Sequence, residues 1–462
     1  MTVDTKAYFS QELLAWYRAH KRDLPWRHSR DPYRIWVSEI MLQQTRVDTV
    51  IPYYKRFLDK FPTLQALAEA PEEEVLKCWE GLGYYSRARN LQAGAREVVR
   101  LHGGSVPDDV HAVAALKGVG PYTRGAIMSI AFNRPEPAVD GNVMRVLSRY
   151  MCLEEDIAKS STRVRMEILA KSLIPEGAAG DFNQGLMELG ALICTPKSPG
   201  CLICPVMAHC AARLAGREKE LPIKSKAKPP RPELRLAALI EGSGEQAGRI
   251  LVRQRPDSGL LARMWELPHI LAEGAEQEGK TRKRGRPAAG AATAVAAAAA
   301  WKAGAGWAWG MDAEQANALE AGPEGVDGES ILKVPLPEQM EQMELLSRQL
   351  AAETSVLVRP RHWWMEADHV FSHIVWKVQV YLTDYGFVLN KTEQAQSEGD
   401  SLFAAESAAG YEANEVAGQR EELPPGYRWI GPAEMEELAF PNVFVRILRE
   451  YWQQRGSNPN SI

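Results

Sequence analysis

The chain contains no continuous apolar run long enough to span a membrane. The one candidate, residues 288–309, is dominated by alanine and glycine and includes Lys302, so its transfer free energy is too small to hold a span. The first residues mix charges with apolar positions and show no small-residue cleavage site, which argues against a signal peptide. We therefore expect a cytoplasmic protein without membrane contact.

Cysteine is scarce and unevenly spread. Of six cysteines, Cys78 and Cys152 lie alone in apolar contexts, and the other four fall within seventeen residues in the pattern C-x6-C-x2-C-x5-C. A cytosolic chain of this size is not expected to contain a disulfide framework. Four clustered thiolates instead favour a tetrahedral sulfur site, for which a [4Fe–4S] cluster and zinc are equally suitable. The predicted metal ligands are Cys194, Cys201, Cys204 and Cys210.

A strong basic charge is also missing. The net charge is −4, with 45% hydrophobic and 25% charged residues, which indicates a soluble globular protein rather than a disordered one. Residues 1–225 carry 30 Lys and Arg against 26 Asp and Glu, and the remainder carries 25 against 33. The N-terminal part therefore has a weakly basic balance, as phosphate binding needs.

The length of 462 residues predicts two or three domains. Up to about Ala215 the apolar residues repeat at helical spacing with hardly any alternation, which predicts an all-α region over residues 1–216. A Lys- and Pro-rich linker is expected at 217–232. Strands at 234–241, 249–254 and 374–382 with a helix at 338–352 predict an α+β domain over 233–455. Residues 273–334, rich in Ala, Gly and Trp, are predicted to be a disordered insertion.

A glycine-containing turn joins two helical patterns near residue 118. In Gly118-Val119-Gly120, the glycines let backbone N–H groups approach an anion at the N-terminus of the following helix. By itself this tripeptide is more often a plain turn. Within the wider pattern L-x-G-V-G-x-x-T it resembles the helix-hairpin-helix of base-excision glycosylases, which clamps a DNA phosphate without reading sequence.

The 6-2-5 cysteine spacing at the end of the all-α region resembles the cluster loop of the same family. The resemblance implies a [4Fe–4S] cluster rather than zinc. It also implies that Gly118, Val119 and Gly120 contact a DNA phosphate.

Cleaving an N-glycosidic bond requires a proton for the leaving base and a negative charge facing the cationic sugar, so two carboxyl groups are the minimum. Glu39 lies among bulky apolar residues that should raise its pKa. Asp140 begins a helix, where the dipole favours the ionised form. Taken alone, Glu39 would be read as a solvated helix residue and Asp140 as a simple N-cap.

The segment Ser38-Glu39-Ile40-Met41-Leu42-Gln43-Gln44-Thr45 is similar to the signature of MutY-type adenine-DNA glycosylases. The resemblance implies that Glu39 protonates adenine, that Asp140 stabilises the sugar cation, and that Tyr122 and Asn142 support the reaction. The residues that it places at the flipped adenine or the opposite base are Arg27, Gln44, Thr45, Leu82, Tyr84, Tyr85 and Gln184. Without it, the aromatics at 84–85 would be read as core.

The residue at position 122 separates two relatives. Bifunctional endonuclease III-like glycosylases have a lysine nucleophile where this chain has Tyr122, and tyrosine cannot form a Schiff base. We therefore expect base removal without efficient strand cleavage. The bifunctional enzyme and a non-catalytic iron–sulfur DNA-binding protein are the alternatives.

Two segments of the C-terminal part resemble the MutT-like domain with which adenine glycosylases recognise 8-oxoguanine. They are residues 259–268 (GLLARMWELP) and Phe371-Ser372-His373. The acidic helix of true Nudix hydrolases is not visible, so pyrophosphate hydrolysis is not expected. The implied partner is double-stranded DNA with an A:8-oxoguanine or A:G mispair, bound by a monomer that associates with the nucleoid.

Overall fold

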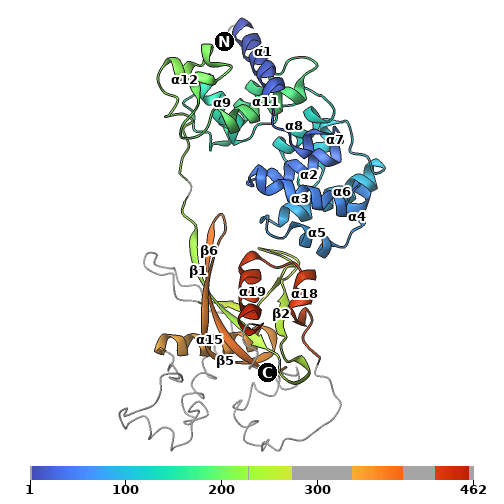
Figure 1. The fold of residues 1–462 in the computed structure, drawn as a ribbon, viewed down its shortest axis with the longest axis vertical. Coiled ribbons are helices and arrows are strands. Elements are labelled where there is room, and N and C mark those ends of the chain that lie inside the picture. Colours follow the sequence, from blue (N-terminus) through green and yellow to red (C-terminus); the bar gives the residue numbers. More distant parts are fainter. Residues whose placement is uncertain (1–2, 227, 273–335, 389–421, 457–462) are drawn as a thin grey trace, which may run out of the picture. The chain divides into compact units, whose positions relative to one another are not determined.

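The computed structural model describes residues 3–226, 228–272, 336–388 and 422–456, so the predicted insertion lies outside the described residues. The chain divides into two compact units (Figure 1). The first comprises Met1–Pro229 with the segments Pro256–Met264 and Glu436–Asn442, and the second comprises the remainder. No helix in the described ranges is long and apolar enough to cross a membrane.

Over residues 3–226 the described elements are helices, in agreement with the all-α prediction. They are α1 (Val3–His20), η1 (Pro25–Arg27), α2 (Pro32–Leu42), α3 (Val47–Lys60), α4 (Leu64–Glu69), α5 (Glu72–Trp79), α6 (Ser86–His102), α7 (Val110–Ala115), α8 (Pro121–Ile130), α9 (Gly141–Tyr150), α10 (Ser160–Lys171), α11 (Ala179–Leu192), η2 (Cys201–Ile203), η3 (Met207–His209) and α12 (Ala211–Leu214).

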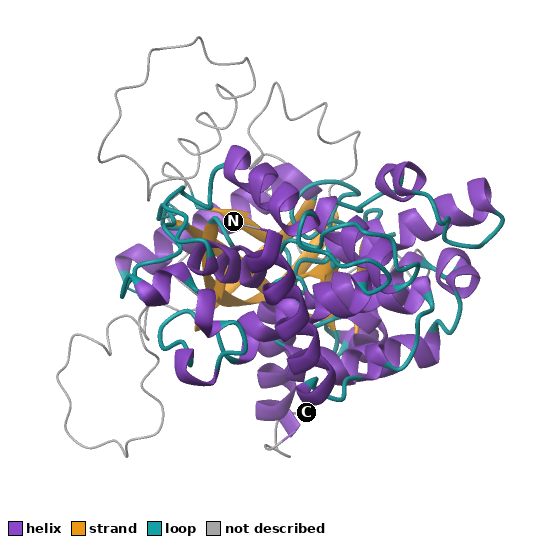
Figure 2. Cartoon of the chain, turned by 90° about the horizontal axis from the view of Figure 1, so that it is seen from above, coloured by secondary structure: helices purple, strands orange, loops and turns teal. Residues whose placement is uncertain are grey.

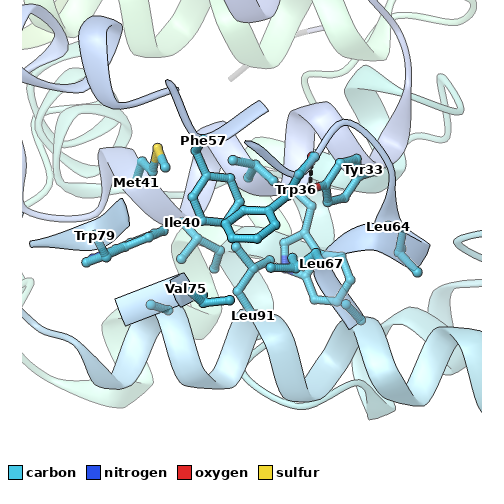
Figure 3. Packing of buried hydrophobic residues seen from close by; sticks show 14 of the residues in the cluster. Tyr33, Trp36, Ile40, Met41, Phe57, Leu64, Leu67, Val75, Trp79 and Leu91 are labelled. Carbon is cyan, nitrogen blue, oxygen red and sulfur yellow. Dashed lines mark hydrogen bonds between the residues drawn. The ribbon is translucent and has the colours of Figure 1, made fainter. Parts of the chain in front are cut away.

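These helices form two hydrophobic cores. One core is built from α2 to α8, and Figure 3 shows Trp36, Phe57 and Trp79 among its buried side chains. The other is built mainly from α1, α9, α10 and α11, and Figure 1 labels α1, α9 and α11 close together. Because α8 packs on both α2 and α11, the two cores meet along α8.

Two helix starts follow directly from local sequence. Asp31 accepts a hydrogen bond from the Tyr33 N–H, and Pro32 occupies the first helical position of α2. Asp140 caps α9 in the same way by accepting from the Val143 N–H. Both starts confirm the sequence prediction. They place Glu39 on a mostly buried helix and Asp140 at the end of another.

The second unit is built on a mixed sheet, in agreement with the α+β prediction. Its elements are β1 (Arg231–Glu241), η4 (Gly244–Gln246), β2 (Ile250–Gln254), β3 (Trp265–Glu266), β4 (His269–Leu271), α15 (Pro337–Thr354), β5 (Val356–Val370), β6 (Ile374–Val388), β7 (Tyr427–Ile430), α18 (Pro432–Glu437) and α19 (Asn442–Gly456). Figure 2 distinguishes the strands from the helices by colour.

The strand order of the described sheet is β3-β2-β1-β6-β5, with β4 paired to β1 and β7 to β2. Strands β1 and β6 are parallel and pair from Arg231↔Ile374 to Glu241↔Asp384. A parallel neighbour requires a crossover connection, and α15 lies between the two strands in sequence. Its Leu346 and Leu350 pack against Leu236 of the sheet in one core.

Candidate active site

Two predicted catalytic residues meet where α2 faces α8. Glu39, on α2, is 5% exposed. The Tyr122 hydroxyl, at the start of α8, donates a hydrogen bond of 2.5 Å to Glu39 Oε2. The same hydroxyl lies 3.2 Å from the sulfur of Met187 on α11. The site therefore lies along the seam between the two helical cores.

Burial raises the pKa of Glu39 to about 7, far above the usual range of a glutamate. The hydrogen bond from Tyr122 and the charge of Arg27 oppose the shift, whereas the nearby Asp140 carboxylate adds to it. Desolvation dominates because a charged carboxylate loses its hydration in this apolar helix. The sequence-based expectation of a raised pKa is confirmed in direction.

Asp140 lies at the N-terminus of α9 and is held by several donors. The Val143 N–H donates to Oδ1 over 2.7 Å, and the Asn142 amide donates to Oδ2 over 2.8 Å. Burial nevertheless raises the pKa of Asp140, and the hydrogen bonds only partly offset this. The N-terminus of α9 therefore favours the ionised form of Asp140, as expected. The net shift of the Asp140 pKa is nevertheless upward, because desolvation outweighs the effect of the helix end.

Asn142 is oriented by an arginine one turn further along α9. Arg145 donates to Asn142 Oδ1 over 2.7 Å, and it also donates to the carbonyl oxygens of Gly190 and Cys194, each over 2.7 Å. The Asn142 oxygen is thereby occupied, so its amide group points its N–H toward Asp140. The carboxylate of Asp140 is fixed through this chain to the end of α11.

Arg27, predicted to contact the base, is held by a buried carboxylate. Glu188 on α11 is 1% exposed and accepts from Arg27 Nη1 and Nη2 over 3.1 and 2.8 Å. It also accepts from the Arg22 side chain over 2.9 and 2.8 Å. Burial raises the pKa of Glu188, but these hydrogen bonds outweigh it and lower the pKa to about 2. The cluster of two guanidiniums and one carboxylate keeps a net positive charge near Glu39.

Gln184 lies on the same helix as Met187 and Glu188. Its side-chain amide donates to the Gly180 carbonyl over 3.3 Å, and the residue is half-buried. The predicted base-pocket residues Arg27 and Gln184 are thus positioned from η1 and α11.

The predicted hairpin joins α7 to α8 through residues 116–120. Gly118 has φ +78°, a left-handed conformation suited to glycine. Gly120 caps α8 without a side-chain hydrogen bond, and both glycines are exposed whereas Val119 is half-buried. An exposed helix N-terminus with no side-chain cap is a favourable place for an anion.

Two segments predicted to contact the opposite base lie at the C-terminal end of α2 and before α6. Gln44 and Tyr84 have positive φ values of 57° and 49°, which cost roughly 1 to 3 kcal/mol each for residues other than glycine. Tyr84 is 46% exposed, whereas Leu82 and Tyr85 are 7% and 5% exposed. Leu82 and Tyr85 therefore pack in the core, as their apolar character alone would suggest. Thr45 donates its hydroxyl hydrogen to the Gln43 carbonyl over 3.3 Å.

The four clustered cysteines line one pocket after α11. Arg149, Arg213 and Glu218 also line it. Arg149 donates to the Cys194 sulfur over 3.3 Å and to the Thr195 carbonyl over 2.7 Å. Over the described residues, no three or more His, Cys, Asp or Glu side chains converge closely enough to bind a single metal ion.

In the second unit, Phe371-Ser372-His373 forms the turn between β5 and β6. The Phe371 N–H donates to the Ile374 carbonyl over 2.8 Å, and the Phe371 ring packs edge-on against Trp376 at 4.9 Å. Ser372 and His373 are exposed. Phe371 therefore anchors the turn, and the two polar residues are presented at its tip.

Several residues that shape the site escaped the sequence interpretation. They are Arg22, Arg87, Arg145, Arg149, Met187 and Glu188. None of these side chains was assigned a partner from the sequence. Glu188 offered one signal, since it is a lone carboxylate in the apolar stretch 186–193, where an unpaired charge would be costly.

Comparisons with known proteins agree with the motifs. A family model described as "HhH-GPD superfamily base excision DNA repair protein" matches residues 37–171. The human adenine DNA glycosylase is 42% identical over 321 residues, covering 58% of each chain. A solved thermostable thymine-DNA glycosylase is 33% identical with a TM-score of 0.42, covering 46% of this chain and 98% of that one.

The chain spans 58 to 62% of the length of its mammalian relatives. A bacterial relative is covered more fully. The adenine DNA glycosylase of Buchnera aphidicola subsp. Baizongia pistaciae is 34% identical over 270 residues, covering 58% of this chain and 76% of the relative. On this similarity, the chain belongs to the adenine DNA glycosylase family.

Proposed function

We propose that this protein is a monofunctional DNA glycosylase that hydrolyses the N-glycosidic bond of adenine mispaired with 8-oxoguanine or guanine. The observation that carries the proposal is the buried Glu39 carboxyl, hydrogen-bonded to Tyr122 and close to the Asp140 carboxylate. Family membership supplies the substrate class, and the pair of carboxyl groups supplies the chemistry.

In this mechanism Glu39 is the general acid. With a pKa of about 7 it carries a proton in a large fraction of molecules at neutral pH and can transfer it to the leaving adenine. Asp140 faces the sugar as an anion, stabilised by the Val143 and Asn142 donors. Because the negative charge of Asp140 adds to the raised pKa of Glu39, the pair holds one proton more readily than it loses both. That proton belongs on Glu39, which has no cap donors of the Asp140 kind.

Tyr122 fits a monofunctional enzyme. Its hydroxyl is engaged with Glu39, and burial raises its pKa well above the usual range, so it stays protonated and is no nucleophile. A flipped adenine would be bordered by Arg27 and Gln184, while Gln44, Thr45 and Tyr84 would face the opposite strand. Gly118, Val119 and Gly120 would bind a phosphate at the N-terminus of α8.

The second unit is proposed to be a MutT-like domain in which Phe371, Ser372 and His373 recognise 8-oxoguanine. The packed Phe371 and the exposed Ser372 and His373 support this assignment. The partner would be mispaired double-stranded DNA, bound by a monomer in the cytoplasm or nucleoid.

A decisive test of the function is a single-turnover assay with enzyme in excess over a duplex containing 8-oxoguanine:A. We expect adenine release and an alkali-labile site without strand cleavage. Release of adenine with spontaneous strand cleavage would indicate the bifunctional alternative. Tight binding without release would indicate the non-catalytic one.

We further propose that Cys194, Cys201, Cys204 and Cys210 hold a [4Fe–4S] cluster. All four cysteines line one pocket, and Arg149 offers a donor to a cluster thiolate. Burial raises the pKa of Cys204 to about 12, so binding would have to displace protons. When bound, the cluster would cross-link the loop of residues 194–210 and could exchange electrons.

Anaerobically purified protein is therefore expected to be yellow-brown and to contain about four irons per chain. Iron and zinc analysis by mass spectrometry, together with the visible absorption spectrum, would check this. Colourless protein with one zinc per chain would assign the site to zinc instead.

The double substitution Ser372→Ala, His373→Ala is expected to weaken the preference for 8-oxoguanine:A over G:A while leaving G:A cleavage nearly intact. Each lost hydrogen bond to a neutral partner is worth about 1 kcal/mol, or several-fold in affinity. Single-turnover rates and duplex affinities on both mispairs measure the ratio. Lys377→Ala, an exposed change further along β6, is the control. An unchanged ratio in a folded double variant would contradict the recognition role.

A further inference from the structure

Arg87, on α6, is a buried guanidinium with an unusual set of partners. Its side chain is in the core, with the residue 9% exposed. Nη1 donates to the carbonyl oxygens of Ile40, Met41 and Gln43 over 2.8, 3.2 and 2.6 Å. Nη2 donates to the carbonyls of Leu82 and Gly83 over 3.2 and 3.0 Å, and lies 3.5 Å from Thr45 Oγ1.

Backbone carbonyls, rather than a carboxylate, stabilise the positive charge of Arg87. Arg87 has no ion-pair partner within the described ranges. Burial lowers its pKa to about 10, which still leaves it charged at neutral pH. Three of its acceptors belong to the end of α2, where helix carbonyls lack partners and the dipole is negative. Arg87 therefore caps the helix that carries Glu39.

The other acceptors belong to the segment before α6, which contains Tyr84. Both connected segments contain a residue in the left-handed region, Gln44 with φ 57° and Tyr84 with φ 49°. Such conformations persist only where the surroundings enforce them. The guanidinium also lies 5.5 Å from the centres of the Tyr84 and Trp79 rings, within cation–π range. One side chain thus restrains both strained segments.

We propose that Arg87 is a positioning residue that holds the Gln44 and Tyr84 segments at a fixed separation, so that they enter the duplex together when adenine is unstacked. The proposal rests on the proposed function, because it concerns how that substrate is opened. The proposed role of Arg87 requires no contact between its side chain and the DNA. It acts through the backbone of the two segments, and through the end of α2 on Glu39.

The test compares Arg87→Ala and Arg87→Lys with Gln92→Leu. Gln92 lies on the same helix, is 1% exposed and donates to the Leu67 and Ala70 carbonyls over 3.1 and 2.7 Å, away from both segments. Gln92→Leu therefore removes a comparable buried side-chain contact without touching either segment. Thermal unfolding establishes that each variant is folded. Arg87→Lys keeps the positive charge. If Arg87→Ala does not fold, the positioning role is tested with Arg87→Lys alone.

The readouts are the fluorescence of 2-aminopurine in place of adenine, which rises on unstacking, and single-turnover adenine release. In the Arg87 variants we expect the rise in 2-aminopurine fluorescence and the rate of adenine release each to fall at least about tenfold. Their affinity for an undamaged duplex should change less than about twofold. Gln92→Leu should retain both signals near wild type. If the Arg87 variants match Gln92→Leu, the proposal is overturned. If the wild type itself releases no adenine, the proposed function fails instead.

Discussion

Glu39→Gln is expected to slow adenine release at least about 100-fold, while affinity for the mispaired duplex changes little. Glutamine keeps the size of the side chain and can still accept the hydrogen bond from Tyr122, so the packing of α2 should persist. It has no proton of suitable acidity to transfer to the leaving base. Single-turnover rates and equilibrium binding on an 8-oxoguanine:A duplex separate the two effects.

The matched control is Glu74→Gln on α5. Glu74 forms an exposed ion pair of 2.8 Å with Lys60, and removing such a pair changes little. Release by Glu39→Gln within tenfold of this control would mean that another group donates the proton.

The pH profile of the wild type follows from the same pKa. The acid form of Glu39 is the active one, so release should fall as the pH rises through about 7 and approach a tenfold loss per pH unit above it. On the acid side the rate should fall where Asp140 takes up a proton, at a pH above the usual aspartate range. Rates measured from pH 5 to 9 would show the alkaline limb, and measurements at lower pH would show the acid limb. A profile flat through pH 7 would contradict the assignment of Glu39.

Asp140→Asn is expected to reduce release by about 100- to 1000-fold with little loss of stability. Asparagine caps helices about as well as aspartate, so α9 should keep its N-terminus. What is lost is the negative charge that faces the developing sugar cation. The acid limb of the pH profile should disappear with it. Single-turnover rates and thermal unfolding of the variant give the two quantities.

Asp109→Asn is the control for this change, because Asp109 caps α7 by accepting from the Ala112 N–H over 2.8 Å. Both substitutions exchange the same atoms at a helix cap, but Asp109 is exposed and caps α7 rather than the helix end beside Glu39. We expect Asp140→Asn and Asp109→Asn to have similar unfolding temperatures, while only Asp140→Asn loses adenine release. A large drop in the unfolding temperature of Asp140→Asn alone would assign Asp140 a structural rather than a chemical role.

Much of the fold could be predicted because helix caps and strand alternation depend only on residues that are neighbours in the sequence. The Asp31-Pro32 start of α2, the Asp140 cap of α9 and the alternating strand beginning at Ile374 all appear as expected. The raised pKa of Glu39 was also foreseen, since its neighbours along the helix are apolar.

What the sequence could not give are contacts between distant residues. Arg87 meets the end of α2 from more than forty positions away, and Glu188 meets Arg27 from 161 positions away. Neither partner can be read from a helical pattern in which arginine and glutamate suggest a wet surface. The raised pKa of Asp140 was missed for the same reason. Its desolvation comes from tertiary packing rather than from the helix that it begins.

The parallel pairing of β1 with β6 has a consequence for biosynthesis. During translation β1 leaves the ribosome first, and its main partner follows only after residue 374 has been made. Until then one long edge of β1 has unpaired backbone groups and buried-type side chains, which is the condition for mispairing with other chains. A nonsense mutation anywhere between the two strands would therefore be expected to yield an aggregation-prone fragment of the second unit rather than a smaller folded domain.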